Sequence, residues 1–279
     1  MTLADQFFGT TLSEVPSHIT KLLIDTQTKP FLEPKEPRVG VTDSFKELCD
    51  ARLCFQRLLK PKKLICGEEV FDPRIELMKA PNFKTAYNFH LGSWMENGFT
   101  QLFIDAGLVP PLDDLITGKK AVGIDGLPLD KAVQVQLYDP SLSLLGFADL
   151  ITTRNGVIQV EEIKSTESQL IPQLPRDNNI RQLNSYIGVA MERFGASSRG
   201  ILWYLIKGDS AIYPYEVCFR EDWYQEDVAR AQKIVKMVNN NQLGKRACAD
   251  EKMGRALKCE LSRLCFRTEQ FGLDLEELE

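Results

Sequence analysis

The chain has 279 residues, of which 43% are hydrophobic and 26% are charged, and its formal net charge is −5. No segment reaches the roughly 18 apolar residues that a membrane span requires, and Met1 to Gln6 lack the basic flank and apolar core of a signal peptide. We therefore expect an intracellular globular protein without a membrane partner, in the cytoplasm or nucleoid, or in the host cytoplasm if it is viral. Its seven cysteines, an odd number, then suit free thiols or metal ligands better than a disulfide framework.

The charge is unevenly distributed along the chain. Seven basic and three acidic residues fall between Lys245 and Arg267, whereas Thr268 to Glu279 carry five acids and no base. A second basic group surrounds Cys54 and comprises Arg52, Arg57, Lys60, Lys62 and Lys63. The acidic end hides local positive charge in the total, so a nucleic-acid partner is compatible with the net charge.

The predicted elements follow from hydrophobic periodicity and from proline and glycine punctuation. Residues 1–41 form a proline-interrupted N-terminal arm, residues 42–267 a single domain, and residues 268–279 an acidic tail. Helices are predicted at 42–60, 82–107, 177–194 and 221–240, and strands at 132–138, 143–152, 157–164, 200–207 and 211–219. Arg154-Asn155-Gly156 is a tight turn that joins two strands into a hairpin. Mixed helices and strands of this kind predict an α/β fold with helical additions.

Charged residues on the predicted hairpin are candidates for a metal site. Asp149 ends Gly146-Phe147-Ala148-Asp149, and Glu162 and Lys164 share one strand face in Val160-Glu161-Glu162-Ile163-Lys164 because side chains alternate. Carboxylates that meet there would suit Mg²⁺ or Mn²⁺. An exposed salt bridge is the commoner fate of an isolated Glu-x-Lys. The chain has a second Glu-x-Lys at Glu33-Pro34-Lys35, where the proline argues against a strand that could hold the two side chains on one face. The apolar flanks of the hairpin favour the functional interpretation.

Together with Gln182-Leu183-Asn184-Ser185-Tyr186, these motifs resemble the PD-(D/E)XK nuclease superfamily. The resemblance is to its RecB-like branch, which includes the AddB nuclease domain, lambda-type exonucleases and CRISPR-adaptation nucleases. It implies a restriction-endonuclease-like core in which a central mixed sheet is flanked by helices, with extra N-terminal helices. It also implies Asp149, Glu162 and the Ile163 carbonyl as metal ligands and Lys164 as the catalytic lysine. Gln182 and Tyr186 would line the site and touch the substrate backbone.

The family pattern Gly-x-x-x-His or Gly-x-x-x-Glu on a preceding helix is matched by Gly92-Ser93-Trp94-Met95-Glu96. We favour Glu96 as the further metal ligand. His90 is the weaker candidate, because it lies on another side of the helix unless the helix starts between the two residues.

The resemblance further implies a [4Fe-4S] cluster held by one early and three late cysteines, with zinc as the alternative on ligand type. Cys259 and Cys265 match the five-residue spacing of the late ligands, but position 256 is alanine, which leaves Cys248 as the third. Cys54 is the preferred early ligand, with Cys49 and Cys66 as competitors. Cys218, inside a predicted strand, is expected to be buried as a small apolar residue.

The function implied is that of a metal-dependent DNA exonuclease acting on single strands or duplex ends in recombination, repair or phage DNA processing. A site-specific endonuclease and a non-cleaving nucleic-acid-binding module on the same fold are the alternatives.

Overall fold

The computed structural model describes residues 39–40, 49–51, 53–54, 62–65, 68–71, 83–111, 131–139, 142–209, 211–240, 242–250, 252–257, 259 and 261–266. The chain divides into two compact units, the first made of residues 1–38, 47–90 and 233–279 and the second of residues 39–46 and 91–232. The predicted arm lies outside the described residues except for Val39–Gly40, and the predicted acidic tail lies outside them entirely. No helix in the described part of the chain is long and apolar enough to cross a membrane.

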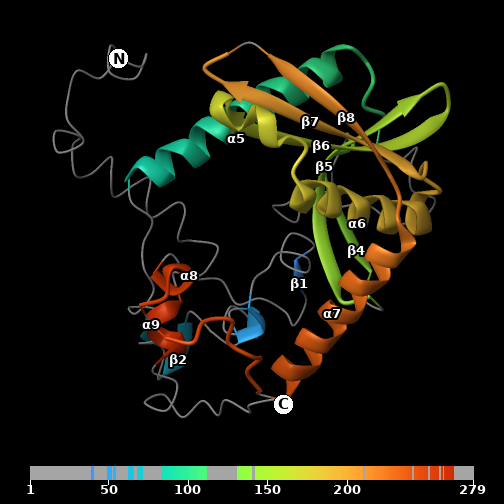
Figure 1. Ribbon diagram of the computed structural model, residues 1–279. Helices are drawn as coiled ribbons and strands as arrows, with labels where there is room; N and C mark the ends of the chain where they lie inside the picture. The colour runs from blue at the N-terminus through green and yellow to red at the C-terminus, as the bar shows by residue number, and fades with distance from the viewer. Residues whose placement is uncertain are drawn as a thin grey trace, which may run out of the picture. The chain divides into compact units, whose positions relative to one another are not determined.

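The second unit is built on a mixed sheet in the order β1-β5-β6-β7-β8, with β4 also paired to β5 (Figure 1). Its strands are β1 (Val39–Gly40), β4 (Val133–Asp139), β5 (Leu144–Arg154), β6 (Val157–Glu167), β7 (Arg199–Lys207) and β8 (Ile212–Cys218). Its helices are η4 (Ser168–Gln173) and α6 (Asp177–Phe194), together with most of α5 (Phe83–Asp105) and α7 (Glu221–Asn239), each of which extends into the first unit. The predicted α/β class, with a central mixed sheet flanked by helices, is confirmed.

The predicted hairpin is present and sets the register of the two site strands. Asn155 and Gly156 have φ of 53° and 76°, which is the conformation of the type I′ turns that suit the twist of a hairpin. The antiparallel pairing runs from Arg154↔Val157 back to Leu150↔Glu161. Asp149 and Glu162 are the next two residues, so they lie opposite each other where this pairing stops.

Strands β5 and β6 separate beyond that point, which leaves a fork in the sheet. From Leu150 back to Leu144, β5 pairs with β4 on one side, and at Leu144 and Leu145 it pairs with β1 on the other. Over 160–167, β6 pairs in parallel with β7. Beside Glu162 to Glu167, therefore, no described strand pairs with β6 on its β5 side. The backbone groups of β6 that face this gap need other partners.

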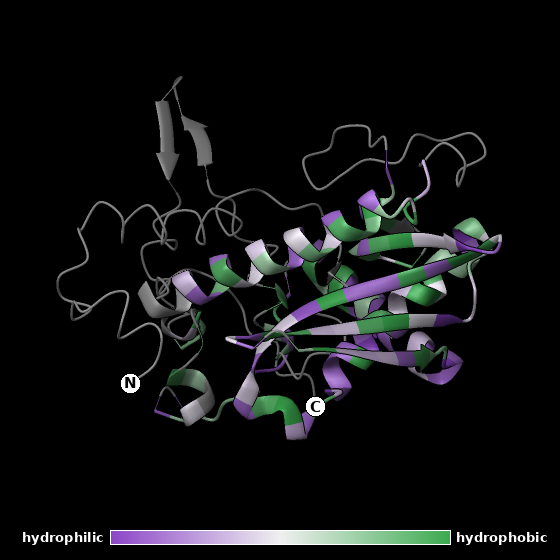
Figure 2. Ribbon diagram, turned by 90° about the horizontal axis from the view of Figure 1, so that it is seen from above, coloured by the Kyte–Doolittle hydropathy of each residue, from purple (hydrophilic) through white to green (hydrophobic). Residues whose placement is uncertain are grey.

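Helices α6 and α5 lie against opposite faces of the sheet (Figure 1). On the α5 face, Phe99, Phe103 and Trp203 form an edge-to-face aromatic cluster with ring centroids 5.2 to 5.7 Å apart. On the α6 face, Leu183 and Ile187 are fully buried, and each such side chain contributes about 1.5–3 kcal/mol through burial. Apolar residues accordingly occupy the middle of the strands (Figure 2).

The bounds of α6 have local causes. Asp177 lies in its first turn, where a negative charge complements the helix dipole. Gly195 ends it in the left-handed conformation, with φ of 64°, and donates its N–H to the Met191 carbonyl, a common helix end for glycine.

A glycine on β7 allows α6 to pack closely on the sheet. A Cβ at Gly200 would lie 2.8 Å from the Val160 carbonyl and within 3.1 Å of α6 side chains.

The first unit contains short elements that the sequence patterns did not predict. They are the antiparallel hairpin of β2 (Lys62–Ile65) and β3 (Glu68–Phe71), and the single-turn helices α8 (Gly254–Leu257) and α9 (Ser262–Cys265). Such elements are too short to show hydrophobic periodicity. Of the helix predicted at 42–60, the described positions 50, 51, 53 and 54 are helical.

Candidate active site

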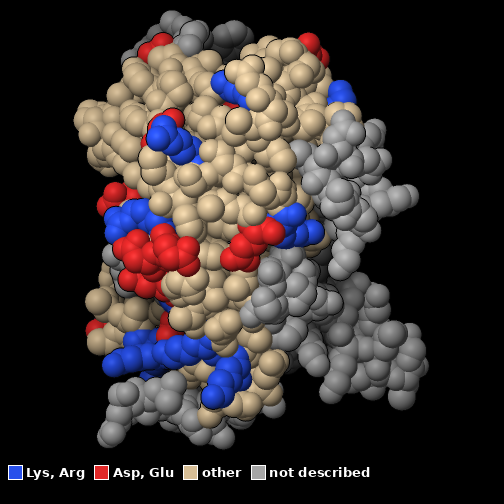
Figure 3. All heavy atoms as spheres, turned by 90° about the vertical axis from the view of Figure 1, so that its right-hand side faces the viewer, with Lys and Arg blue, Asp and Glu red and all other residues tan. Residues whose placement is uncertain are grey.

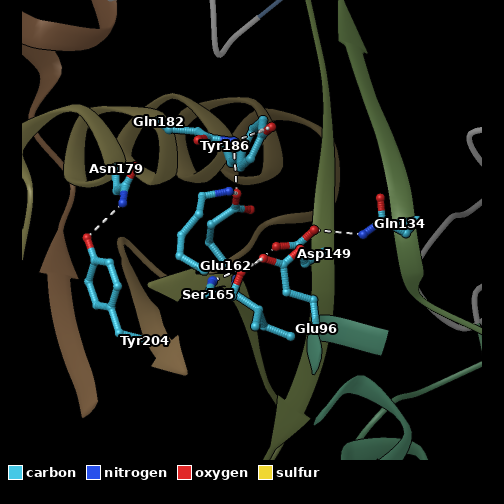
Figure 4. Close-up of polar contacts among 11 residues, drawn as sticks. Glu96, Gln134, Asp149, Glu162, Ser165, Asn179, Gln182, Tyr186 and Tyr204 are labelled. Atoms are coloured by element: carbon cyan, nitrogen blue, oxygen red, sulfur yellow. Dashed lines mark hydrogen bonds and ion pairs between the residues drawn. The ribbon is translucent and has the colours of Figure 1, made fainter. Parts of the chain in front are cut away.

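The fork between β5 and β6 is closed by two carboxylates. Backbone N–H groups of Ile163 and Ser165 face away from β7 and toward the gap, because alternate residues of a strand direct their backbone groups to opposite sides. Asp149 Oδ2 accepts from the Ile163 N–H at 2.8 Å, and Glu96 Oε1 accepts from the Ser165 N–H at 3.0 Å. A second bond, from Ser165 Oγ at 3.1 Å, holds the same Glu96 oxygen. Two acidic side chains thus replace the missing strand and are fixed by backbone geometry (Figure 4).

Glu162 is the most deeply buried acid of this group, with only 1% of its surface exposed. Its Oε1 accepts hydrogen bonds from the Lys164 ammonium and, at 2.8 Å, from Gln182 Nε2. Its Oε2 is buried and has no hydrogen-bond partner. Burial and the neighbouring Asp149 carboxylate raise the pKa of Glu162 to about 8, although Lys164 opposes that shift. An unpaired buried carboxylate oxygen is costly, and a bound cation would remove that cost.

Lys164 supplies the positive charge of the site. Burial by itself would lower the pKa of this lysine, but Glu162 and Asp149 outweigh that effect and raise the pKa above its ordinary range. Lys164 therefore stays protonated at neutral pH. Glu96 is also affected: burial, and then the Asp149 charge, raise the pKa of its carboxyl.

Helix α6 presents Gln182 and Tyr186 to this cluster, as the four-residue spacing predicts. Gln182 Nε2 donates to the Tyr186 hydroxyl at 2.9 Å as well as to Glu162. The first turn of the helix is held against β7 by Tyr204, whose hydroxyl accepts from Asn179 Nδ2 at 2.8 Å and from the Arg176 N–H at 3.1 Å. The helix that carries Gln182 is thus anchored beside the Glu162 strand (Figure 4).

Glu96 and His90 both lie on α5, which begins at Phe83. The helix does not start between them, so six residues separate the two side chains by roughly 120° around the axis. Glu96 reaches Ser165 because Gly92, one turn earlier, allows a close approach: a Cβ there would lie 2.5 Å from Ser165 Oγ. The structure therefore brings Glu96 to the fork, and the helix turns His90 in another direction.

Two further residues support the cluster without having been predicted. Ser165 directly follows the catalytic lysine candidate, and Gln134 Nε2 donates to Asp149 Oδ1 at 2.7 Å. Glu161 lies on the other strand face, as alternation predicts, and is fully buried there. It accepts from Thr152 Oγ1 at 2.5 Å and Trp203 Nε1 at 2.7 Å, and it pairs with Arg154 at 3.2 Å. No sequence motif marks Gln134, because its role depends on a neighbouring strand.

The site chemistry fits Mg²⁺ or Mn²⁺. Within the described ranges, no three His, Cys, Asp or Glu side chains are placed to hold one metal ion together. Such cations commonly take only one or two protein carboxylates and complete their shells with water and substrate phosphate. Asp149 and Glu162, with the unpaired Glu162 Oε2, provide that number. The Ile163 carbonyl faces the same side of β6 as its N–H, toward the fork.

The candidate cysteine ligands all belong to the first unit, and Cys66 lies outside the described residues. Burial raises the pKa of the Cys265 thiol to about 12, and the nearby thiols Cys49, Cys259 and Cys248 influence it electrostatically. Burial likewise raises the pKa of the Cys54 thiol to about 11; the Gly244 backbone opposes that shift and Cys49 adds to it.

The expectation that Cys218 is buried is wrong. The thiol is exposed at the end of β8, an edge strand whose alternate residues face solvent. The face of the molecule shown in Figure 3 mixes acidic and basic side chains. Ion pairs of the described residues with at least one exposed partner include Arg181–Glu226, Arg199–Glu216 and Arg220–Asp222.

No protein-family model matches the chain, and no curated protein matches it. Among solved structures, SSO0001 is similar with a TM-score of 0.48 and 19% identity, over 89% of this chain and 96% of that chain. The alkaline exonuclease LHK-Exo from Laribacter hongkongensis has a TM-score of 0.42 and 10% identity, over 90% of this chain and 100% of its own. Its complex with dAMP gives the same TM-score and identity, over 91% and 100%. These likenesses are low, so the function has to be inferred from the residues of the site.

Proposed function

We propose that this protein is a metal-dependent nuclease that hydrolyses phosphodiester bonds of DNA. The observation that carries the proposal is the buried, unpaired Glu162 Oε2 beside Asp149 and Lys164 at the fork. A buried glutamate beside a half-buried aspartate and a protonated lysine has little value for stability, whereas it suits the binding of Mg²⁺ or Mn²⁺ and a phosphate. DNA as the substrate is supported by the resemblance of these motifs to the RecB-like nucleases.

Each residue has a role that follows from its position. Asp149 and Glu162, with the Ile163 carbonyl, would hold the cation, which when bound stabilises negative charge on the phosphate and lowers the pKa of water. Glu96, whose Oε1 is held by Ser165, is the further ligand that the resemblance implies. Lys164 keeps its proton and places a positive charge where charge develops on the phosphate during hydrolysis. Gln182 and Tyr186 orient Glu162 and line the side of the site formed by α6.

The test uses Asp149→Ala and Lys164→Ala in degradation of end-labelled DNA with Mg²⁺ or Mn²⁺. Both variants should lose activity by at least about 100-fold, since each removes a charge that stabilises the transition state. Glu226→Ala is the matched control, because that acid is exposed and remote in sequence from the fork residues. Unchanged degradation by both site variants would refute the assignment.

The same substrates separate the modes of action. We propose cleavage from ends, as an exonuclease acting on single strands or duplex ends in recombination, repair or phage DNA processing. Products that shorten progressively from a labelled end support this mode, whereas a discrete internal cut indicates a site-specific endonuclease. Binding without cleavage across both cations indicates a non-cleaving module.

We further propose that the first unit binds a [4Fe-4S] cluster, or zinc, through Cys248, Cys259 and Cys265. The proposal rests on the resemblance of the cysteine spacing to that of the RecB-like branch. Cys54 remains the preferred fourth ligand, with Cys49 and Cys66 as competitors; Cys49 acts electrostatically on both Cys54 and Cys265.

A further inference from the structure

One residue at the fork has an unusual backbone conformation. Gln134 is the second residue of β4, between the residues that pair as Val133↔Leu150 and Val135↔Ala148, and its φ is +50°. This left-handed region is sparsely populated by residues other than glycine, asparagine and aspartate. A strand residue does not need it, and the neighbouring pairs Val133↔Leu150 and Val135↔Ala148 keep a regular register on both sides.

The residue with this left-handed backbone, Gln134, also makes a specific hydrogen bond to Asp149. The flanking register places Gln134 opposite Asp149, and its Nε2 donates to Asp149 Oδ1 at 2.7 Å. The second oxygen of the same carboxylate, Oδ2, accepts from the Ile163 N–H at 2.8 Å. Each oxygen of Asp149 therefore has its own donor, and two donors from strands on either side fix the plane of the carboxylate (Figure 4).

Local strain that surrounding structure maintains is typical of functional sites. The fork explains why it is needed here. Beyond Leu150 the strand β6 no longer constrains β5, so the Asp149 side chain projects where the sheet gives it least support. Besides the Ile163 N–H, a donor on the neighbouring strand β4 can restrain it, and Gln134 supplies that donor.

We propose that Gln134 is a positioning residue that orients Asp149 for cation binding, and that its left-handed backbone serves this purpose. The inference rests on the proposed function, because it assigns Asp149 to the cation. Supporting groups that hydrogen-bond a ligating side chain commonly change metal affinity by roughly 10–100-fold when removed.

The experiment compares Gln134→Ala and Gln134→Gly by Mn²⁺ binding to the metal-free protein, measured by electron paramagnetic resonance. Both substitutions remove the amide donor, but only glycine adopts a positive φ without strain. Both variants should bind Mn²⁺ about 10-fold more weakly than the wild type, while Gln134→Gly has the higher melting temperature of the two. Gln136→Ala, a glutamine on the same strand, should bind Mn²⁺ like the wild type.

The glycine variant distinguishes positioning from a purely structural role. If Gln134 only supports the strand, Gln134→Gly binds Mn²⁺ with wild-type affinity, and that result overturns the inference while the proposed function stands. If the wild-type protein itself neither binds Mn²⁺ nor degrades DNA, the proposed function fails and the inference falls with it. Weaker binding by both variants, with wild-type tryptophan fluorescence, supports the inference.

Discussion

Replacing Glu162 with glutamine should make the metal-free protein more stable at alkaline pH, because the substitution removes a buried charge. The carboxyl has an ordinary pKa of 4.5 and a pKa of about 8 in the folded protein. Since the folded-state pKa is raised, its contribution to stability is present below about 4.5 and is lost as the pH rises through about 8. The pKa difference of about 3.5 corresponds to at most about 5 kcal/mol, of which about 3 kcal/mol should be lost between pH 5 and pH 8.

The assay is urea unfolding followed by tryptophan fluorescence in the presence of EDTA. All three tryptophans, Trp94, Trp203 and Trp223, lie in the second unit, so the signal reports the unit that contains the site. The difference in unfolding free energy between the wild type and Glu162→Gln should change by about 3 kcal/mol from pH 5 to pH 8 in favour of the variant. A comparison of the two proteins at each pH cancels the titration of other groups.

Mn²⁺ provides the second half of the prediction. A cation competes with the proton for Glu162, so its affinity for the wild type should rise with pH toward and above pH 8. At 100 times its dissociation constant, it should stabilise the wild type by about 2.7 kcal/mol and the glutamine variant much less. A difference between the two proteins that does not vary with pH would refute the burial argument, and equal stabilisation by Mn²⁺ would refute the assignment of Glu162 as a ligand.

Two further predictions follow. Gly92→Ala places a Cβ 2.5 Å from Ser165 Oγ, so the hydroxyl must turn away and lose its hydrogen bond to Glu96. We expect this variant to lose about 1 kcal/mol of stability and some nuclease activity. At Gly98 of the same helix nothing lies within 4 Å of a Cβ, and alanine there should be neutral or stabilise by up to about 1 kcal/mol; equal melting temperatures for the two variants would contradict this. Cys265→Ser should lower the iron or zinc content of anaerobically purified protein, measured by elemental analysis, while replacement of the exposed Cys218 of the second unit by serine should leave that content unchanged; wild-type protein with neither metal would exclude the proposed cysteine site.

Much of the local structure could be predicted because its causes are local. The Asn155-Gly156 turn sets the hairpin, and alternation places Glu161 and Glu162 on opposite faces. The short elements β1, β2, β3, α8 and α9 were not predicted, because two to four residues carry no measurable period. The exposure of Cys218 was mispredicted because an apolar run does not distinguish a central strand from an edge strand.

For the candidate site, too, features with local causes could be predicted and features that depend on distant parts of the chain could not. By itself, the sequence determined the order of Asp149, Glu162 and Lys164, the helix of Gln182 and Tyr186, and the choice of Glu96 over His90. Only the tertiary structure decided that β5 and β6 separate at Asp149 and Glu162, and that two acids take the place of the missing strand. The physical reason is that a backbone N–H without a neighbouring strand needs another hydrogen-bond acceptor. That acceptor can come from a residue far away in the sequence, so local patterns do not predict it.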